Sequence, residues 1–215
     1  MKGIIAILFF ALISSFSLEA QNTSAKAKQY LAKAAQRLEA NDHIYLGFTY
    51  TFENNKVEPP VVQTEEGNIA IKEDDFHLNF LGTEQIKQGN KIYTILEEDE
   101  EVQVTEYEEN ESQAVSPVKI LSSYQKGYSY KIDKTVKEKG RDVLYILLKP
   151  NASEEVKQIM VVMDKKSLRV KEVKQWASNG TITTFTITEY APNKKLPKDY
   201  FIFNKANYEG YYIAE

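Results

Sequence analysis

The chain has 215 residues, a formal net charge of −4 and a pI near 5.5, and 42% of its residues are hydrophobic. This composition is that of an ordinary globular protein, and it excludes a disordered chain and a chain that spans membranes along most of its length. The mild net charge gives no reason to expect a nucleic-acid partner. Aromatic residues make up 12% of the chain, with 14 Tyr and 10 Phe, which favours a β-rich fold.

The first 20 residues have the pattern of a secretory signal peptide. Lys2 precedes an apolar run from Ile4 to Ile13, and Ala20 supplies a small residue for cleavage. The run is shorter than the roughly 20 apolar residues that a membrane anchor requires. We therefore predict a signal peptide over residues 1–20 and one exported domain over residues 21–215. The chain has no cysteine, the residue that carries the lipid of a bacterial lipoprotein, so we expect a soluble exported protein.

The mature chain opens with a predicted helix that ends near Ala40. Thr23 or Ser24 can cap its start, and Asn41-Asp42 marks its end. Its apolar residues recur at helical spacing, which predicts one face buried against the rest of the domain. These residues are Ala27, Tyr30, Leu31, Ala34 and Leu38.

After this helix, alternating apolar and polar residues predict a series of short strands. Pro59-Pro60 interrupts the pattern and suggests an edge or a bulge. Asn179-Gly180, between two β-rich runs, is typical of a hairpin turn. Because short turns separate the strands, we expect an antiparallel meander. The expected strands cover residues 44–52, 67–71, 76–80, 91–96, 102–107, 143–148, 158–163, 169–176, 181–190 and 200–203.

Residues 116–127 depart from the strand pattern and predict a short helix. Ser116 can cap it, Pro117 suits its first turn and Gly127 suits its end. The preceding segment, Glu97 to Glu111, holds nine acidic residues and no basic one. Such a run is usually a solvated surface, and the alternative is a docking surface for a basic partner.

Signals for catalysis are few. Only His43 and His77 could act as histidine bases, and His77 falls on the polar side of a predicted strand, where we expect a solvated side chain. The sequence contains no H-E-x-x-H, G-x-S-x-G or phosphate-loop motif. Ser123 to Lys126 fits S-x-x-K, but four residues match often by chance and no K-T-G follows. We predict that the protein is not an enzyme, with no catalytic residue, no metal site and no cofactor.

The apolar side chains of the stretch from Gly67 to Phe80 form a ladder with two possible roles. They can pack into a closed core, or they can line a hollow that takes an apolar ligand. Periodicity alone does not separate these roles.

The order of several short motifs resembles the LolA family, the periplasmic carriers that take lipoproteins to the outer membrane of Gram-negative bacteria. An Ala/Leu-rich helix leads into Phe48-Thr49, and Gly67 to Lys72 is similar to the family's G-x-hydrophobic-x-hydrophobic-K. Gln88 to Tyr93 is similar to its D-G-K-x-hydrophobic-W/F, Pro117 opens the mid-chain helix, and Tyr145 to Pro150 loosely resembles its L-x-P-K segment. The C-terminal order N-x-x-L…F-x-F…G is matched by Asn193, Leu196, Phe201, Phe203 and Gly210.

The resemblance implies a mostly β fold with helices. The expected architecture is an incomplete antiparallel β-barrel, a curved meander sheet, capped by the N-terminal helix and the short mid-chain helix. Its cavity would bind the acyl chains of a lipoprotein, and a lid would close it. The implied lining residues are Leu46, Phe48, Phe76, Leu78, Phe80, Ile92 and Phe185, with Val118 and Leu121 as contacts from the lid.

The implied function is shuttling of lipoproteins from the inner to the outer membrane. The implied partners are outer-membrane lipoproteins and an inner-membrane lipoprotein-releasing transporter, with a periplasmic monomer as carrier and no nucleic acid. The alternative is a LolA-fold periplasmic lipid-binding or envelope-stress-sensing module with a different ligand, similar to RseB. A further alternative is an exported β-protein whose apolar face is packed shut or docks a protein.

One departure concerns control of the lid. Well-known carriers have an Arg-Pro pair after the strand Lys, and the arginine holds the lid closed. Here Lys72 is followed by Glu73, so control of the lid must differ or rest on another contact, such as Lys119 or Lys126. The usual Trp after this corner is also absent.

Overall fold

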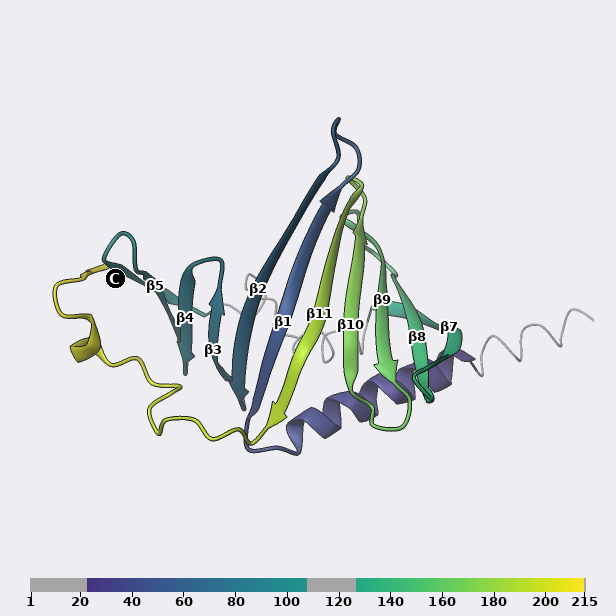
Figure 1. Ribbon diagram of the computed structural model, residues 1–215, viewed down its shortest axis with the longest axis horizontal. Coiled ribbons are helices and arrows are strands. Elements are labelled where there is room, and N and C mark those ends of the chain that lie inside the picture. Colours follow the sequence, from purple (N-terminus) through teal and green to yellow (C-terminus); the bar gives the residue numbers. More distant parts are fainter. Residues whose placement is uncertain (1–22, 108–126, 215) are drawn as a thin grey trace, which may run out of the picture.

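The computed structural model describes residues 23–107 and 127–214. Residues 23–39 form an α-helix, and most of the other described residues belong to one sheet (Figure 1). The strands are β1 (Ile44–Asn54), β2 (Val61–Lys72), β3 (Asp75–Phe80), β4 (Thr83–Gln88), β5 (Lys91–Leu96), β6 (Glu101–Glu106), β7 (Tyr128–Glu138), β8 (Arg141–Pro150), β9 (Val156–Asp164), β10 (Val170–Ala177), β11 (Thr181–Pro192) and β12 (Tyr212–Ala214), with a short 3-10 helix, η1 (Lys205–Tyr208), before β12.

The strands form one open, curved sheet in the order β12-β6-β5-β4-β3-β2-β1-β11-β10-β9-β8-β7. β1 lies in the middle and pairs with β2 on one side and β11 on the other. The edge strands β12 and β7 lie at opposite ends of the sheet. The predicted antiparallel meander is confirmed within β1–β6 and within β7–β11, and the two runs join where β1 pairs antiparallel with β11. β12 pairs in parallel with β6, which the prediction did not include.

The N-terminal helix packs on one face of the sheet, which we call the helix face. It runs along the lower ends of β10, β9 and β8 (Figure 1). Ala27, Leu31 and Ala34 are at most 2% exposed, because the helical spacing brings them onto one side of the helix. They join side chains of β1–β3 and β8–β11 in a large helix-face core. Within the described ranges, no helix is long and apolar enough to cross a membrane.

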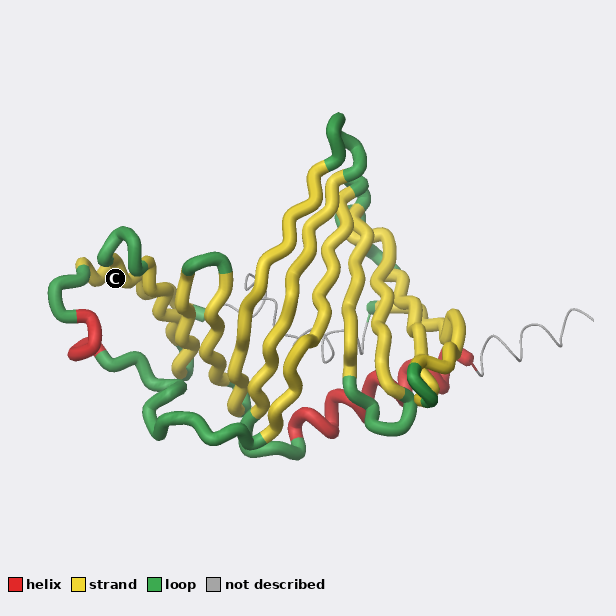
Figure 2. The backbone as a smooth tube through the Cα atoms, in the orientation of Figure 1, coloured by secondary structure: helices red, strands yellow, loops and turns green. Residues whose placement is uncertain are grey.

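The opposite face, which we call the outer face, carries a second and smaller core. Residues 193–214, which we call the C-terminal strap, leave β11 and run to the far edge of the sheet (Figure 2). Beneath the strap, Ile86, Ile95 and Val102 of β4–β6 are at most 4% exposed. Aromatic and aliphatic side chains pack against these three residues, namely Tyr93, Val104, Phe203, Tyr208, Tyr211 and Ile213.

The predicted elements agree with the structure at the N-terminal helix and at most strands. The Asn179-Gly180 hairpin joins β10 and β11 as predicted. The predicted strand over residues 200–203 is wrong, because this segment forms turns within the strap. Pro59-Pro60 lies in the loop that joins β1 to β2 and ends directly before β2 begins. The predicted helix over residues 116–127 lies outside the described residues, apart from Gly127.

Candidate functional site

The strand register gathers the predicted ligand residues on the helix face. Phe76, Leu78 and Phe80 of β3 stand opposite Ile71, Ile69 and Gly67 of β2. The same face continues through β1 into β11, and through β4 into β5. It therefore carries seven of the nine predicted residues, Leu46, Phe48, Phe76, Leu78, Phe80, Ile92 and Phe185. Val118 and Leu121 lie outside the described residues.

These seven residues differ in burial. Leu46, Phe48, Phe76 and Phe185 are at most 6% exposed and belong to the helix-face core. Leu78 and Phe80 are half-buried and pack against that core. Ile92 is half-buried on β5 and belongs to neither core. Of the predicted residues, a ligand can therefore reach Leu78, Phe80 and Ile92 without unfolding the core.

Four rings form what we call the aromatic cluster on this face: Phe48, Tyr50, Phe80 and Phe185. The ring centroids of Phe48 and Phe185 are 4.3 Å apart, and those of Phe48 and Phe80 are 5.5 Å apart. Tyr50 contacts Phe80 and Phe185 edge-on at 5.5 and 5.9 Å. Burial raises the pKa of the Tyr50 hydroxyl above its ordinary value. The cluster is thus an apolar surface whose two outer rings, Tyr50 and Phe80, keep part of their area open.

Gly67 gives the Phe48 ring its place in the cluster. A Cβ atom on Gly67 would lie 2.5 Å from Cζ of Phe48 and 2.9 Å from the carbonyl oxygen of Asn79. Any larger residue must therefore displace the ring or the β3 backbone. This contact gives a physical reason for the glycine at the start of the Gly67 to Lys72 motif.

A small crevice lies between the helix and the sheet. Its volume is about 20 Å³, which is enough for about one water molecule. Apolar residues of the helix, β1, β10 and β11 line it, and Arg37 and Arg169 lie at its margin. The Arg169 guanidinium stacks 4.6 Å from the Tyr190 ring centroid. A long acyl chain therefore cannot enter here unless the helix moves, which favours the aromatic cluster as the first point of contact.

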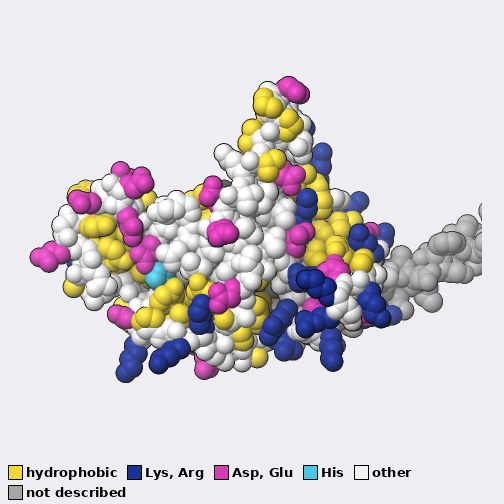
Figure 3. Space-filling model, in the orientation of Figure 1, with side chains coloured by type: hydrophobic (Ala, Val, Ile, Leu, Met, Phe, Trp, Pro, Cys, Tyr) yellow, Lys and Arg dark blue, Asp and Glu magenta, His cyan; other side chains and the backbone are white. Residues whose placement is uncertain are grey.

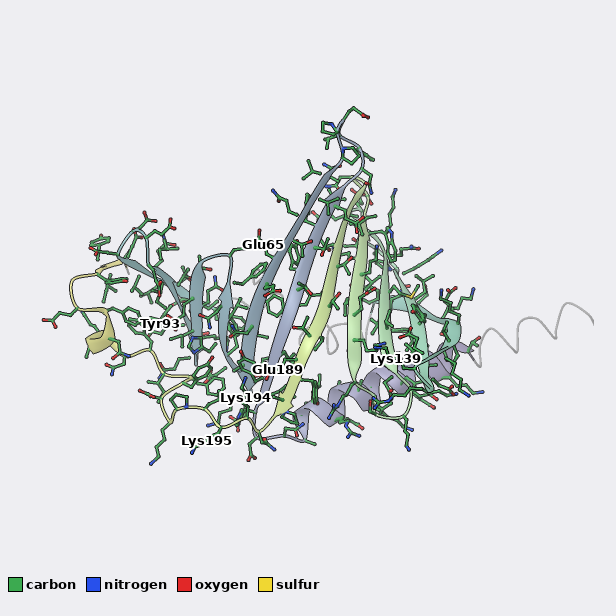
Figure 4. The ribbon with its side chains drawn as sticks, in the orientation of Figure 1. Glu65, Tyr93, Lys139, Glu189, Lys194 and Lys195 are labelled. Atoms are coloured by element: carbon green, nitrogen blue, oxygen red, sulfur yellow. The ribbon has the colours of Figure 1, made fainter. Side chains whose placement is uncertain are left out.

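A larger groove of about 560 Å³ lies mainly on the outer face, and it is polar. Four glutamates line it, namely Glu66, Glu84, Glu97 and Glu189. Lys194 of the strap pairs with Glu189 at 3.0 Å and lies 3.5 Å over the Tyr45 ring centroid (Figure 4). The central strands present mainly polar side chains and backbone on the face seen in Figure 3. Such a lining does not suit an acyl chain.

His77 is buried on the outer face, so the prediction of a solvated histidine is wrong. It is 8% exposed and stacks on Tyr200 of the strap, with ring centroids 4.3 Å apart. Nδ1 lies 2.7 Å from the Tyr200 carbonyl oxygen, and Nε2 lies 2.6 Å from Oε1 of Glu84. The second contact lacks regular hydrogen-bond geometry, but it places the ring nitrogen directly against the carboxylate.

The partners of His77 lie on two different parts of the chain. The Tyr200 carbonyl oxygen belongs to the strap, and the Glu84 carboxylate belongs to β4. The contact with His77 and a 3.1 Å hydrogen bond from the Tyr208 hydroxyl hold the pKa of the Glu84 carboxyl below its usual range, against the opposing effect of burial. Desolvation and the nearby Glu84 raise the pKa of Tyr208. The arrangement fastens the strap to β3 and β4.

Two features of this site were not predicted from sequence. Tyr50 shares the alternation of Phe48 on β1, and this periodicity could have placed it in the cluster. The burial of His77 depends on Tyr200, 123 residues later, and the local pattern holds no signal of it. Within residues 23–107 and 127–214, no three potential ligands come together to hold a metal ion.

Comparison with known proteins finds one matching family and several proteins of similar structure. The family model "Outer membrane lipoprotein carrier protein LolA" matches residues 83–204. No curated protein matches the chain. An uncharacterized conserved protein from Thermus thermophilus is similar in structure, with a TM-score of 0.54 and 8% identity over 86% of this chain and 97% of that chain. LprF from Mycobacterium bovis is similar with a TM-score of 0.51 and 9% identity over 82% and 98% of the two chains.

A putative outer membrane lipoprotein-sorting protein domain from Vibrio parahaemolyticus also matches, with a TM-score of 0.46 and 12% identity over 86% of this chain and 99% of that chain. Identities this low relate the folds of these chains and nothing more. The family match begins at β4 and ends within the strap.

Proposed function

The chain belongs to the LolA family of outer membrane lipoprotein carrier proteins, and from this membership we propose that it is a periplasmic carrier that binds lipoprotein acyl chains on the helix face. The aromatic cluster is the observation that supports this proposal. Its rings expose part of their apolar surface to solvent, and they lie beside the helix-face core, against which a bound acyl chain would pack. Each CH₂ group removed from water there contributes about 0.8 kcal/mol, so a chain can be held by a few contacts and later released.

The proposal assigns roles along the chain. Residues 1–20 are a signal peptide that is removed on export, and residues 21–215 are the carrier domain. The acyl chains contact Leu78, Phe80 and Tyr50 first and reach the more buried predicted residues as the helix face opens. Val118 and Leu121 contact the ligand from the segment between β6 and β7. The partners are outer-membrane lipoproteins and an inner-membrane lipoprotein-releasing transporter, and the protein carries out no catalysis.

A second candidate function is a LolA-fold periplasmic lipid-binding or stress-sensing module with another ligand. Glu73 is the observation that favours it. This residue stands exposed at the turn between β2 and β3, with a φ of 54°, where well-known carriers place the arginine that holds the lid. An acidic residue there cannot make the same contacts, so the trigger for release or the ligand would differ.

The two candidates are separated by adding the exported domain to spheroplasts of the source bacterium. A carrier releases lipoproteins into the supernatant as a soluble one-to-one complex. Uptake of a fluorescent acyl probe without release of lipoproteins would favour the second candidate. Failure of both would show that the helix face is only a core.

A variant pair tests the site itself. Phe80→Ser removes a half-buried ring of the aromatic cluster, and we expect acyl-probe affinity to fall about tenfold, since losing such contacts costs about 1.4 kcal/mol or more. Leu81→Ser is the matched control, because Leu81 is the adjacent apolar residue and is 62% exposed outside the cluster. Equal losses in both variants would contradict the assignment. His77 is unsuitable as a control, because its substitution disturbs the strap.

A further inference from the structure

The hairpin of β1 and β2 projects beyond the rest of the sheet and ends in exposed apolar side chains. β3 pairs with β2 only from Gly67 onward, so, among the strands the structure describes, the preceding part of β2 pairs with β1 alone. Val57, Val61 and Val62 are 41%, 38% and 63% exposed. They are three of the six most exposed large hydrophobic residues in the described ranges. We call residues 55–62, which include Pro59-Pro60, the hairpin tip; it stands out at the top of Figures 1 and 3.

The hairpin tip is continuous with the aromatic cluster. Val61 stands opposite Asn54, and the next β1 side chains on the same face are Phe52, Tyr50 and Phe48. Phe52 and Tyr50 are half-buried, and Phe48 belongs to the core. Beyond Asn54, a row of rings on β1 therefore leads from the side of the tip that carries Val61 to the ligand site of the proposed function. Val62 faces the opposite side, because it stands opposite Glu53.

The size and charge of the tip restrict its partner. A stable protein interface buries about 800 Å² on each side, with shape complementarity, whereas this tip is a narrow convex loop. A bilayer demands only apolar atoms at the point of insertion. Trp176 lies on the same level of the outer face, three strands from Val62, where an indole suits the membrane interface. Residues 53–66 hold four glutamates and one lysine, which disfavours an anionic surface.

We propose that the hairpin tip inserts into the surface of a zwitterionic lipid bilayer and so brings the aromatic cluster to the acyl chains that the protein takes up or delivers. This inference rests on the proposed carrier function and adds the place of membrane contact. The acidic residues below the tip limit its depth, because they must stay hydrated while Val57 and Val62 enter the apolar layer.

The natural sequence has no cysteine, so single labels can be placed without other changes. Val62→Cys carries an environment-sensitive fluorophore at the tip, and Ile202→Cys carries it on the strap, where Ile202 is 49% exposed. With vesicles of phosphatidylcholine, we expect a blue shift and a rise in emission from the label at position 62 and little change at position 202. Adding anionic lipid should weaken the response at position 62. No response at position 62, or equal responses at both positions, would overturn the proposal, and the first result would favour a protein partner.

A second measurement separates this inference from the proposed function. The double variant Val57→Ser/Val62→Ser should bind phosphatidylcholine vesicles at least fivefold more weakly, while its uptake of a soluble acyl probe stays normal. Ile202→Ser is the matched control and should keep both properties. Normal vesicle binding by the double variant would refute the tip as the contact site even if acyl uptake is confirmed. Loss of acyl uptake in all variants would instead count against the proposed function.

Discussion

The two halves of the sheet are stabilised on opposite faces. The helix-face core draws on the N-terminal helix, β1–β3 and β8–β11, but no residue of β4–β6 belongs to it. The outer-face core consists of β4–β6 and the C-terminal strap. The sheet therefore changes its buried side between β3 and β4. The ligand site of the proposed function lies near this change, where the helix no longer covers the helix face.

Lys87 shows how the change is accommodated. It lies on the helix face of β4, opposite Phe76 of β3, and it is only 4% exposed. Its ammonium group donates hydrogen bonds to the carbonyl oxygens of Asp74 and Gly89, at 2.7 and 3.0 Å. The charge is thus satisfied by the turns beside it, while its aliphatic stem covers the edge of the apolar ladder. From this strand outward, the buried core lies on the outer face, and the helix face carries mainly polar side chains besides Ile92 and Leu96.

Shortening one buried side chain in each core should show how much each core contributes to the free energy of unfolding. Ile146 and Ile95 are both 0% exposed, but the first lies in the helix-face core and the second in the outer-face core. We expect Ile146→Ala to lower the free energy of unfolding by about 2–5 kcal/mol, because the closely packed surroundings cannot collapse into the cavity. Ile95→Ala should cost less, because the strap can settle into the space. Urea unfolding measures both, and a larger loss for Ile95→Ala would reverse the comparison.

Near the boundary between the two halves of the sheet, a larger side chain at Gly67 should lower the stability of the fold. Gly67→Ala places a Cβ atom against the Phe48 ring and the Asn79 carbonyl oxygen, and overpacking of this kind costs about 1–3 kcal/mol. The shifted ring should also weaken acyl-probe binding. Gly82→Ala serves as a control for the loss of a glycine, since nothing lies within 4 Å of its added Cβ atom, although its φ of 72° brings a conformational cost. If both variants bound the probe normally, Gly67 would have no role in shaping the cluster.

The attachment of the strap should weaken when the His77 imidazole is removed. His77→Gln can satisfy Glu84 or the Tyr200 carbonyl oxygen but not both in the same way, and one unsatisfied buried group costs about 1–3 kcal/mol. We expect faster hydrogen exchange at residues 199–213 than in the wild type, with little change in β8–β10. Unchanged exchange in the strap of the variant would mean that the contacts of His77 do not hold the strap in place.

The helix-face half was the more predictable from sequence, for physical reasons. Strands such as β1 alternate strictly between apolar and polar residues, because one of their faces is buried throughout. β4, which reads Thr-Glu-Gln-Ile-Lys-Gln, lacks that alternation and was not predicted. β7 was also not predicted: Tyr128, Tyr130 and Ile132 alternate with polar residues, but a bulge after Ile132 interrupts the pattern and the rest of the strand is mostly charged. His77 was misplaced because the alternation rule assumes that the second face of a strand meets water. The strap contains several aromatic residues, such as Phe203 and Tyr208. Their presence in a segment without a strand pattern was the available indication that the strap packs against another part of the protein.

The smallest expected effect concerns acid stability of the outer-face core. Glu84 has a pKa below its ordinary value in the folded protein, chiefly through the His77 contact. A lowered folded-state pKa means that the carboxylate stabilises the fold above its unfolded-state value, roughly 4.3, and that this contribution is lost as the pH falls through the folded-state value. Wild-type protein should therefore lose stability more steeply below about pH 4 than Glu84→Gln. Because Glu84 is partly exposed, the difference should be modest, and it should appear first as faster hydrogen exchange in the strap. Identical pH profiles for the two proteins would mean that the strap is held by its aromatic contacts alone, with Tyr93 and Phe203 stacked at 4.2 Å as the main fastening.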